Sequence, residues 1–133
     1  MSQQNVEVVR RGIEAWNRRD GELWLSYATP EIEWIPAGPA AVERSVYRGH
    51  AEAASGFESV WQAWEEFRFE ESEVRNLDGL VLWLGRVKMR GTASHVALDQ
   101  EFALHFVLRD GKFVTVRAFV AWHEALADVG LEE

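Results

Sequence analysis

The sequence has no cysteine, and no run of apolar residues approaches the length of a membrane-spanning helix. The lack of cysteine excludes a disulfide framework, thiolate metal ligands and a cysteine nucleophile. The first residues, Met-Ser-Gln-Gln-Asn-Val-Glu, include no apolar signal region. We therefore expect a cytoplasmic protein with no membrane partner.

Positive charge is also scarce, with 14 Lys and Arg against 22 Asp and Glu and a net charge of -8. No stretch is rich in Lys or Arg, which argues against binding of the nucleic-acid backbone. The four histidines, at positions 50, 95, 105 and 123, lack the close spacing of a zinc or iron site. We expect no nucleic-acid partner, no protein-bound metal and no cofactor.

Hydrophobic residues, in contrast, make up 47% of the 133 residues, and seven of them are tryptophans. This length and composition are typical of a globular chain with a real core. No repeat or linker divides the sequence, so we predict a single domain over residues 1–133. The tryptophans stand at positions 16, 24, 34, 61, 64, 83 and 122. Because large aromatic side chains are rarely left in water, they must fill a core, line an apolar cavity or lie at an interface.

The spacing of apolar residues predicts helices in the first half of the chain and strands in the second. The predicted helices cover residues 5–17, a short segment between Asp20 and Pro30, 51–66, and a final turn at 123–128. The predicted strands cover residues 32–35, 67–77 and 80–90, the last two joined by a hairpin turn at Asp78-Gly79. Residues 36–48 form a loop and a candidate lid.

Residues 100–122 predict a further β-hairpin, with a three-residue loop from Arg109 to Gly111. In that register the even-numbered residues of both strands share one apolar face, which we expect to point inward: Phe102, Leu104, Phe106, Leu108, Val114, Val116, Ala118, Val120 and Trp122. The odd-numbered face mixes charged and apolar residues. We expect a homodimer to form through that face, around the residues Ala103, His105, Arg117 and Phe119.

Three motifs accompany this order of elements: Ala15-Trp16-Asn17-Arg18-Arg19-Asp20, Tyr47-Arg48-Gly49-His50 and Leu108-Arg109-Asp110-Gly111-Lys112. In order and spacing, over nearly the whole chain, they resemble the nuclear-transport-factor-2-like superfamily, and most closely its SnoaL-like and ketosteroid-isomerase-like members. The resemblance implies an α+β fold, with a cone-shaped curved antiparallel sheet wrapped around three N-terminal helices, as in the cystatin-like roll. Activity does not follow, because this fold carries isomerases, dehydratases, cyclases, epoxide hydrolases and binding proteins.

The catalytic residues of these relatives are not found at the matching positions. The resemblance places Trp34 where ketosteroid isomerases have a carboxylate base, and Gly12 and Leu104 where they have donors that stabilise an enolate. Ala118 stands at about the position of the acid-base aspartate of the polyketide cyclases. At Arg86-Val87-Lys88, a base replaces an acid of the epoxide hydrolase motif. Whether the protein is an enzyme therefore stays open.

We nevertheless expect an aromatic, nearly uncharged pocket inside the cone, with Tyr27 and Tyr47 offering hydroxyl groups near its mouth. The predicted ligand-binding residues are Trp16, Tyr27, Trp34, Tyr47, Trp61, Trp83, Phe102, Leu104, Phe106, Ala118, Val120 and Trp122.

The titratable residues fit structural roles better than catalytic ones. His105 falls on the mixed face of the hairpin, beside Arg117 or Thr115, and we expect Arg117 to pair with Glu101 or another acid. Asp99 and Glu101 are expected at a solvated rim. His50 stands at a helix N-terminus, where capping or simple exposure is the preferred interpretation.

Three functions remain open. The first is a pocket protein that binds a small hydrophobic molecule, with no activity assigned. The second is a cofactor-independent isomerase, cyclase or dehydratase that acts by proton transfer on a hydrophobic substrate. The third is a non-catalytic dimeric scaffold whose cavity is filled by its own tryptophans. A buried acid or histidine facing inward would favour an enzyme, and a lining of only apolar residues would favour the other two.

Overall fold

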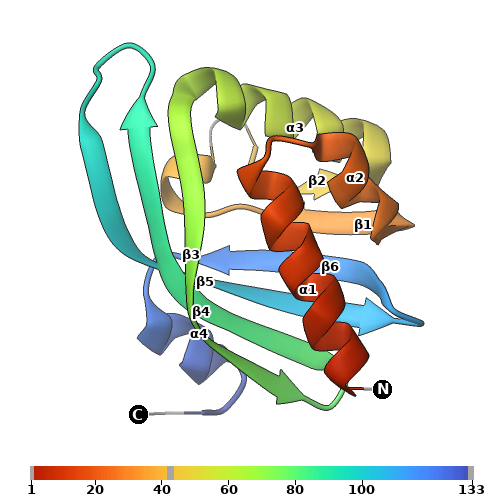
Figure 1. Ribbon diagram of the computed structural model, residues 1–133. Helices are drawn as coiled ribbons and strands as arrows, with labels where there is room; N and C mark the ends of the chain where they lie inside the picture. The colour runs from red at the N-terminus through yellow and green to blue at the C-terminus, as the bar shows by residue number, and fades with distance from the viewer. Residues whose placement is uncertain (1, 42–43, 132–133) are drawn as a thin grey trace.

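A computed structural model describes residues 2–41 and 44–131 and contains a curved six-stranded sheet with helices on both faces (Figure 1). The helices are α1 (Ser2–Asn17), α2 (Gly21–Ser26), α3 (Gly49–Ala63) and α4 (Trp122–Asp128), with a 3₁₀ turn η1 (Gly38–Ala40). The strands are β1 (Ala28–Ile35), β2 (Tyr47–Arg48), β3 (Trp64–Leu77), β4 (Leu80–Gly91), β5 (Ala97–Arg109) and β6 (Lys112–Phe119). The predicted α+β fold class is confirmed. Residues 42 and 43 of the predicted loop lie outside the described residues.

The sheet has the strand order β2-β1-β6-β5-β4-β3, so that β2 and β3 are its edges. Neighbouring strands are antiparallel except β1 and β6, which run parallel. The expectation of a wholly antiparallel sheet was therefore wrong at this one pair. The physical reason is that β1 and β6 are far apart in the chain, and no hairpin turn forces them to run in opposite directions.

Helix α1 is amphipathic, and its apolar face, which includes Val9 and Trp16, is buried against the sheet. Its last turn is bonded to the free edge of β3. The side-chain amide of Asn17 donates to the carbonyl of Phe69 at 3.0 Å and accepts from the same residue's N–H at 2.8 Å. The indole N–H of Trp16 donates to the carbonyl of Phe67 at 3.2 Å. These side chains supply the hydrogen bonds that a further strand would make, and so protect the edge of the sheet.

The β5–β6 hairpin differs from its prediction at the turn. Arg109 pairs with Lys112, so the loop consists of two residues, Asp110 and Gly111, and not of three. Both loop residues have positive φ angles, 53° and 76°, as a type I′ turn requires. A two-residue turn of this type matches the twist of the strands that it joins.

A β-bulge at Val114 then restores the predicted register. Val107 pairs with Thr115 but Leu108 pairs with Phe113, which leaves Val114 without a partner in the ladder. Beyond this extra residue, the even-numbered positions of both strands again share the inner face. The prediction placed Val114 inside, whereas Phe113 is the fully buried residue at this point.

Strand β4 separates two hydrophobic cores, as its alternating pattern predicts. Val81 and Trp83 face the main core under α1, α2 and α3. Leu82 and Leu84 face a smaller core under α4, which also contains Leu126. We call these two sides of the sheet the inner face and the outer face.

The outer face is the surface that we expected to form a homodimer, and α4 of the same chain covers its centre. Ala103 and Phe119 are buried in the small core, and His105 is only 4% exposed. The location of the predicted interface was therefore wrong at these residues. The pattern correctly indicated an apolar surface that needs a cover, and a seven-residue helix after β6 provides it.

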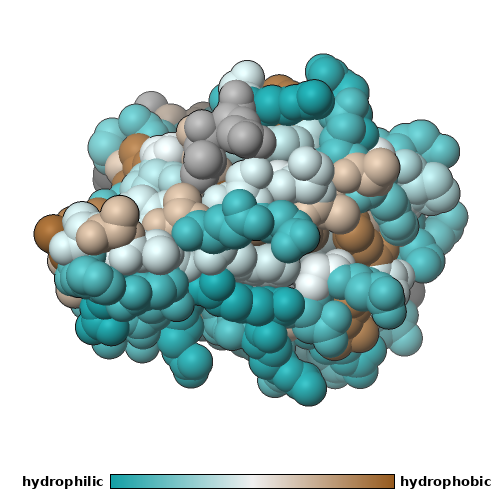
Figure 2. Space-filling view, turned by 90° about the horizontal axis from the view of Figure 1, so that it is seen from above, coloured by the Kyte–Doolittle hydropathy of each residue, from teal (hydrophilic) through white to brown (hydrophobic). Residues whose placement is uncertain are grey.

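The molecular surface seen from above is mostly hydrophilic, with small separated apolar patches (Figure 2). No helix within residues 2–41 and 44–131 is long and apolar enough to cross a membrane. The same residues contain no group of three or more His, Asp or Glu side chains that could hold a metal ion.

Candidate functional site

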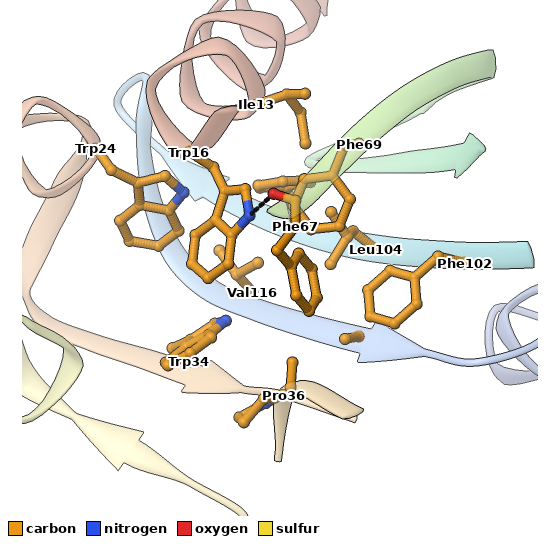
Figure 3. A pocket seen from close by; sticks show the side chains of 13 residues that line it. Ile13, Trp16, Trp24, Trp34, Pro36, Phe67, Phe69, Phe102, Leu104 and Val116 are labelled. Carbon is orange, nitrogen blue, oxygen red and sulfur yellow. Dashed lines mark hydrogen bonds between the residues drawn. The ribbon is translucent and has the colours of Figure 1, made fainter. Parts of the chain in front are cut away.

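The inner face of the sheet and helices α1 and α2 enclose a narrow apolar cavity (Figure 3). Its thirteen lining residues are Ile13, Trp16, Trp24, Trp34, Pro36, Ala40, Phe67, Phe69, Phe102, Leu104, Phe106, Val116 and Ala118. All thirteen are apolar or aromatic, and the indole N–H groups are their only polar side-chain groups. Twelve are buried and one, Ile13, is half-buried. Ile13 on α1 is therefore the most exposed residue of the lining.

The rings around the cavity nearly fill it. The volume open to the centre of a water-sized sphere is about 20 Å³, which is room for about one water molecule. Trp16 occupies the middle of the aromatic cluster. Its ring centroid lies 4.9 Å from that of Trp61, 5.5 Å from that of Phe67 and 6.0 Å from that of Trp34. Any larger ligand has to displace side chains.

The wall at Trp34 depends on a close approach by α3. The ring of Trp34 stacks on that of Tyr47, with centroids 5.1 Å apart. A Cβ atom at Gly56 of α3 would lie 2.7 Å from both rings, which is closer than any real contact of that kind. Residue 56 must therefore be glycine for the helix to pack on this pair.

The lining offers no group for acid-base catalysis, because none of its thirteen side chains titrates. Trp34, Leu104 and Ala118, which the family resemblance aligned with catalytic carboxylates, all line the cavity. Position 12, aligned with a catalytic tyrosine, is packed against a neighbour. A Cβ atom at Gly12 would lie 2.8 Å from Cζ of Phe113. The phenylalanine ring thus fills the space that a side chain from position 12 would need.

The structure brings six of the twelve predicted ligand-binding residues into the cavity lining: Trp16, Trp34, Phe102, Leu104, Phe106 and Ala118. Whether they bind a ligand stays a prediction. The other six, Tyr27, Tyr47, Trp61, Trp83, Val120 and Trp122, lie outside the lining.

Four of these six residues lie elsewhere in the fold. Trp61 packs behind Trp16, and Trp83 is wholly buried against Phe69, so both support the wall without lining it. Val120 is 39% exposed at the end of the sheet. Trp122 begins α4 and packs on the outer face, with its indole N–H 2.9 Å from the carbonyl of Gly85.

The two tyrosines do not supply the expected hydroxyl groups to the cavity. Tyr47 points its hydroxyl toward the chain before β2, where the N–H of Arg44 donates to it at 3.2 Å. Tyr27 is half-buried beside Phe113, with ring centroids 6.4 Å apart. Neither residue can orient a polar group of a ligand inside the cavity in this arrangement.

Sequence reasoning missed seven lining residues: Ile13, Trp24, Pro36, Ala40, Phe67, Phe69 and Val116. Phe67 and Phe69 are two residues apart on a predicted strand. This alternation was the signal that could have placed both side chains on the same face of the sheet. Val116 had been assigned correctly to the inner face of the hairpin. Trp24 was not among the predicted ligand-binding residues, since helix α2 is too short to show which of its sides faces a cavity.

The buried histidine lies on the outer face. His105 and Thr29 are the buried polar residues in the described part of the chain. The Nε2 atom of His105 is 3.0 Å from the carbonyl oxygen of Ala125, and its Nδ1 atom is 3.2 Å from a carboxylate oxygen of Asp128. Arg117 lies 3.7 Å from the other carboxylate oxygen of Asp128, so its predicted acidic partner is Asp128 and not Glu101.

Opposing influences act on His105. Burial lowers the pKa of its imidazole below the ordinary value, and the charge of Arg117 lowers it further, whereas Ala125 and Asp128 raise it. Burial is the largest of these effects. Since both ring nitrogens are engaged with α4, we assign this histidine to the attachment of the helix.

The other polar candidates also have structural partners. Arg86 donates to Asp99 at 2.7 Å on an exposed part of the sheet, as expected for a solvated rim. Glu101 accepts from the N–H of Trp122 at 2.9 Å and thereby caps the first turn of α4. His50 places Nε2 3.1 Å from the carbonyl oxygen of Thr29.

Comparison with known proteins agrees with this architecture. The model of the SnoaL-like domain matches residues 9–116, and no curated protein matched the chain. A solved NTF2-like protein of unknown function from Burkholderia pseudomallei K96243 is 21% identical, with a TM-score of 0.81 over 93% of this chain and 95% of that one. TerC, co-crystallised with polyporic acid, is 21% identical, with a TM-score of 0.79 over 96% and 97% of the two chains.

A third solved structure is a ketosteroid isomerase-like protein from Catenulispora acidiphila DSM 44928 in complex with trimethylamine. It is 10% identical, with a TM-score of 0.77 over 94% of this chain and 93% of that one. At such identities these structures establish a shared fold and no more. The family match covers most of the chain, from α1 to the middle of β6. The chain therefore belongs to the SnoaL-like domain family and has the NTF2-like, ketosteroid isomerase-like fold.

Proposed function

We propose that this protein binds a small apolar molecule in the cavity of the inner face and that the lining residues perform no acid-base chemistry on it. The observation that carries this proposal is the lining itself, thirteen apolar or aromatic residues without one titratable side chain. Such a surface attracts a ligand by burial and ring contact. It supplies no proton donor or acceptor for an isomerase or cyclase.

Binding in this proposal requires the cavity to open. The present volume of about 20 Å³ is far below the several hundred Å³ of typical small-molecule sites. The half-buried Ile13 supports an opening beside α1, because the rest of the lining is buried. Small molecules also occur in two structures of this fold, polyporic acid with TerC and trimethylamine with the Catenulispora protein. These points favour a binding protein over a scaffold with a permanently filled interior.

The test is a fluorescence titration with N-phenyl-1-naphthylamine, a neutral aromatic probe that becomes bright in apolar surroundings. We expect saturable binding of one probe per chain. The variant Ala118→Leu adds bulk to the cavity wall and should abolish binding, while Ala118→Val should weaken it. The matched control is Ala127→Leu, which makes the same change at an exposed position of α4.

Circular dichroism and urea unfolding would establish that each variant is folded. Probe binding that is absent from the wild-type protein, or that is equal in Ala118→Leu and the wild type, would contradict the proposal. The first result would leave the filled scaffold as the better interpretation. The second would place the probe elsewhere on the molecule.

A further inference from the structure

Several tryptophans leave the indole N–H without a hydrogen-bond partner within residues 2–41 and 44–131. Three others donate to backbone carbonyls: Trp16, Trp64 and Trp122. The nitrogens of Trp61 and Trp83 have no partner but are buried among side chains outside the cavity lining. Trp24 and Trp34 remain, and both line the cavity. The cavity wall therefore has hydrogen-bond donors that the protein itself does not use.

The ring of Trp34 is held so that its N–H points into the cavity. Its Cζ3 edge lies against α3, where a Cβ atom at Gly56 would be 2.7 Å away, and Nε1 is on the opposite edge of the indole. The ring also stacks on Tyr47 and meets Phe57 edge to face, with centroids 4.7 Å apart. Figure 3 shows the nitrogen directed toward the space beside Phe67. Since Trp34 is only 5% exposed, it presents a nearly buried donor in a fixed direction.

Trp24 differs in the direction of its donor. Its Nε1 atom lies 3.9 Å from the place of a Cβ atom at Gly12, so this N–H faces α1. The N–H of Trp34 is thus the donor that a molecule inside the cavity would meet.

The cavity supplies no matching acceptor, because none of its thirteen lining side chains has an acceptor atom. A buried donor without a partner is costly, and ordered water often satisfies such groups by making about three hydrogen bonds. A water molecule on Trp34 would accept one bond and find no side-chain acceptor for its own two hydrogens. An oxygen that only accepts, as a carbonyl oxygen does, suits this donor better.

We propose that Trp34 is the polar anchor of the cavity and that its N–H donates to a carbonyl oxygen of the bound molecule. The inference rests on the proposed function and adds to it the class of ligand, a small apolar ketone or aldehyde. The family resemblance places a carboxylate base at this position, so an anchor that donates is opposite in kind. An indole does not ionise at neutral pH, and the bond therefore orients the ligand without moving a proton.

The test uses two molecules of nearly the same shape, acetophenone and cumene, in which a CH–CH₃ group replaces the carbonyl. Displacement of N-phenyl-1-naphthylamine measures both affinities in the wild type and in Trp34→Phe. Phenylalanine keeps a ring and removes the donor, and the ratio of the two affinities cancels the effect of a larger cavity. We expect the affinity for acetophenone relative to cumene to fall about fivefold in Trp34→Phe, the effect of one hydrogen bond. In the wild type, 1-phenylethanol should bind more weakly than acetophenone.

The matched control is Trp61→Phe, which makes the same change in the same aromatic cluster but outside the lining. It should change the ratio by less than twofold. An NMR titration of the wild-type protein gives a second measurement that does not require either variant to fold. Acetophenone should move the Nε1–H resonance of Trp34 downfield, as a hydrogen bond does, and cumene should not.

The proposal for Trp34 is overturned, and the proposed function stands, if N-phenyl-1-naphthylamine binds and acetophenone does not displace it. The same conclusion follows if the ratio is equal in the wild type and Trp34→Phe, or if it falls as much in Trp61→Phe. A Trp34 resonance that does not move downfield with acetophenone also overturns it. If N-phenyl-1-naphthylamine does not bind to the wild-type protein, both proposals fail together.

Discussion

The two faces of the sheet carry opposite kinds of chemistry, although they alternate along the same strands. On β5, Leu104 and Phe106 line the apolar cavity, and His105 between them points to the other side. The inner face has aromatic rings and no titratable side chain in its cavity. The outer face has the buried histidine, with Asp128 and Arg117 around it. The side with a cavity thus lacks acid-base groups, and the side with acid-base groups has been closed by a helix.

This division follows from what the polar and aromatic side chains of each face contact. Titratable groups on the outer face are engaged in holding α4, through His105 and through Glu101 at the first turn of the helix. On the inner face, aromatic rings occupy the space that polar side chains would need, as Phe113 does beside Gly12. The inner face therefore carries the main aromatic core and the cavity, and the outer face carries the contacts that attach α4.

The largest expected effect compares a tryptophan from each face. Trp16→Ala should destabilise the protein by about 4 kcal/mol, because it removes a buried ring from the aromatic cluster and a hydrogen bond to β3. Trp122→Ala should cost only about 2 kcal/mol, since that ring is half-buried on the outer face. Urea unfolding followed by circular dichroism measures both. Equal losses of unfolding free energy would show that the two rings stabilise the protein to the same extent.

The second test detaches the cover of the outer face. Leu126→Asp places a carboxylate in the small core and should cost about 3 kcal/mol, which is enough to release α4. The surface around Ala103 and Phe119 would then be exposed, and we expect the variant to self-associate. Sedimentation velocity over a range of concentrations measures this association. Ala127→Asp, on the exposed side of the same helix, is the control and should behave as the wild type.

The outer face also shows where sequence reasoning reached its limit. The alternation on β5 correctly identified a second apolar surface, with Ala103 and Phe119 on it. The pattern could not say whether a second chain or a later segment of the same chain would cover that surface. A helix of seven residues has too few turns for a clear period, and so Trp122 was assigned to the strand face that it follows.

On the inner face, the two-residue periodicity was sufficient for the part of the lining that comes from the β5–β6 hairpin. Leu104, Phe106 and Ala118 were placed by parity alone, and the bulge at Val114 was the one break in that rule. A bulge adds a residue without changing the hydrophobic pattern, so two errors, the loop length and the missing bulge, cancelled each other. Cavity volume could not be predicted, because it depends on how rings from α1, β1 and β3 pack together.

The third test concerns the edge of the sheet where the inner face meets α1. Asn17→Ala removes both hydrogen bonds to the backbone of Phe69 and should cost about 2 kcal/mol. The control Asn76→Ala alters an exposed asparagine on the same strand β3. Hydrogen exchange should show faster exchange at the amide of Phe69 in Asn17→Ala. An unchanged exchange rate would mean that α1 is held to β3 by ring contacts alone.

The smallest expected effect is the dependence of stability on pH through the outer face. Because burial lowers the pKa of His105 in the folded protein, the unfolded chain binds the proton more readily. Stability from this group is therefore complete above about pH 6.5, the ordinary histidine value, and decreases as the pH falls toward the folded value. The slope is at most about 1.4 kcal/mol per pH unit for one proton. Urea unfolding at several pH values should show this slope in the wild type but not in His105→Gln.

The direction of the pKa shift of His105 can be checked independently by NMR titration of its imidazole. Asp128 raises the pKa of His105, so Asp128→Asn should lower the midpoint of the His105 titration further. The protein should then continue to lose stability down to a lower pH than the wild type does. A midpoint above the ordinary histidine value in the wild type would mean that Asp128 and Ala125 outweigh burial. In that case the outer face would hold a charged imidazolium, and α4 would be attached more firmly in acid. The affinity for N-phenyl-1-naphthylamine, in contrast, should be the same above and below the titration midpoint of His105, because no side chain that lines the inner cavity titrates.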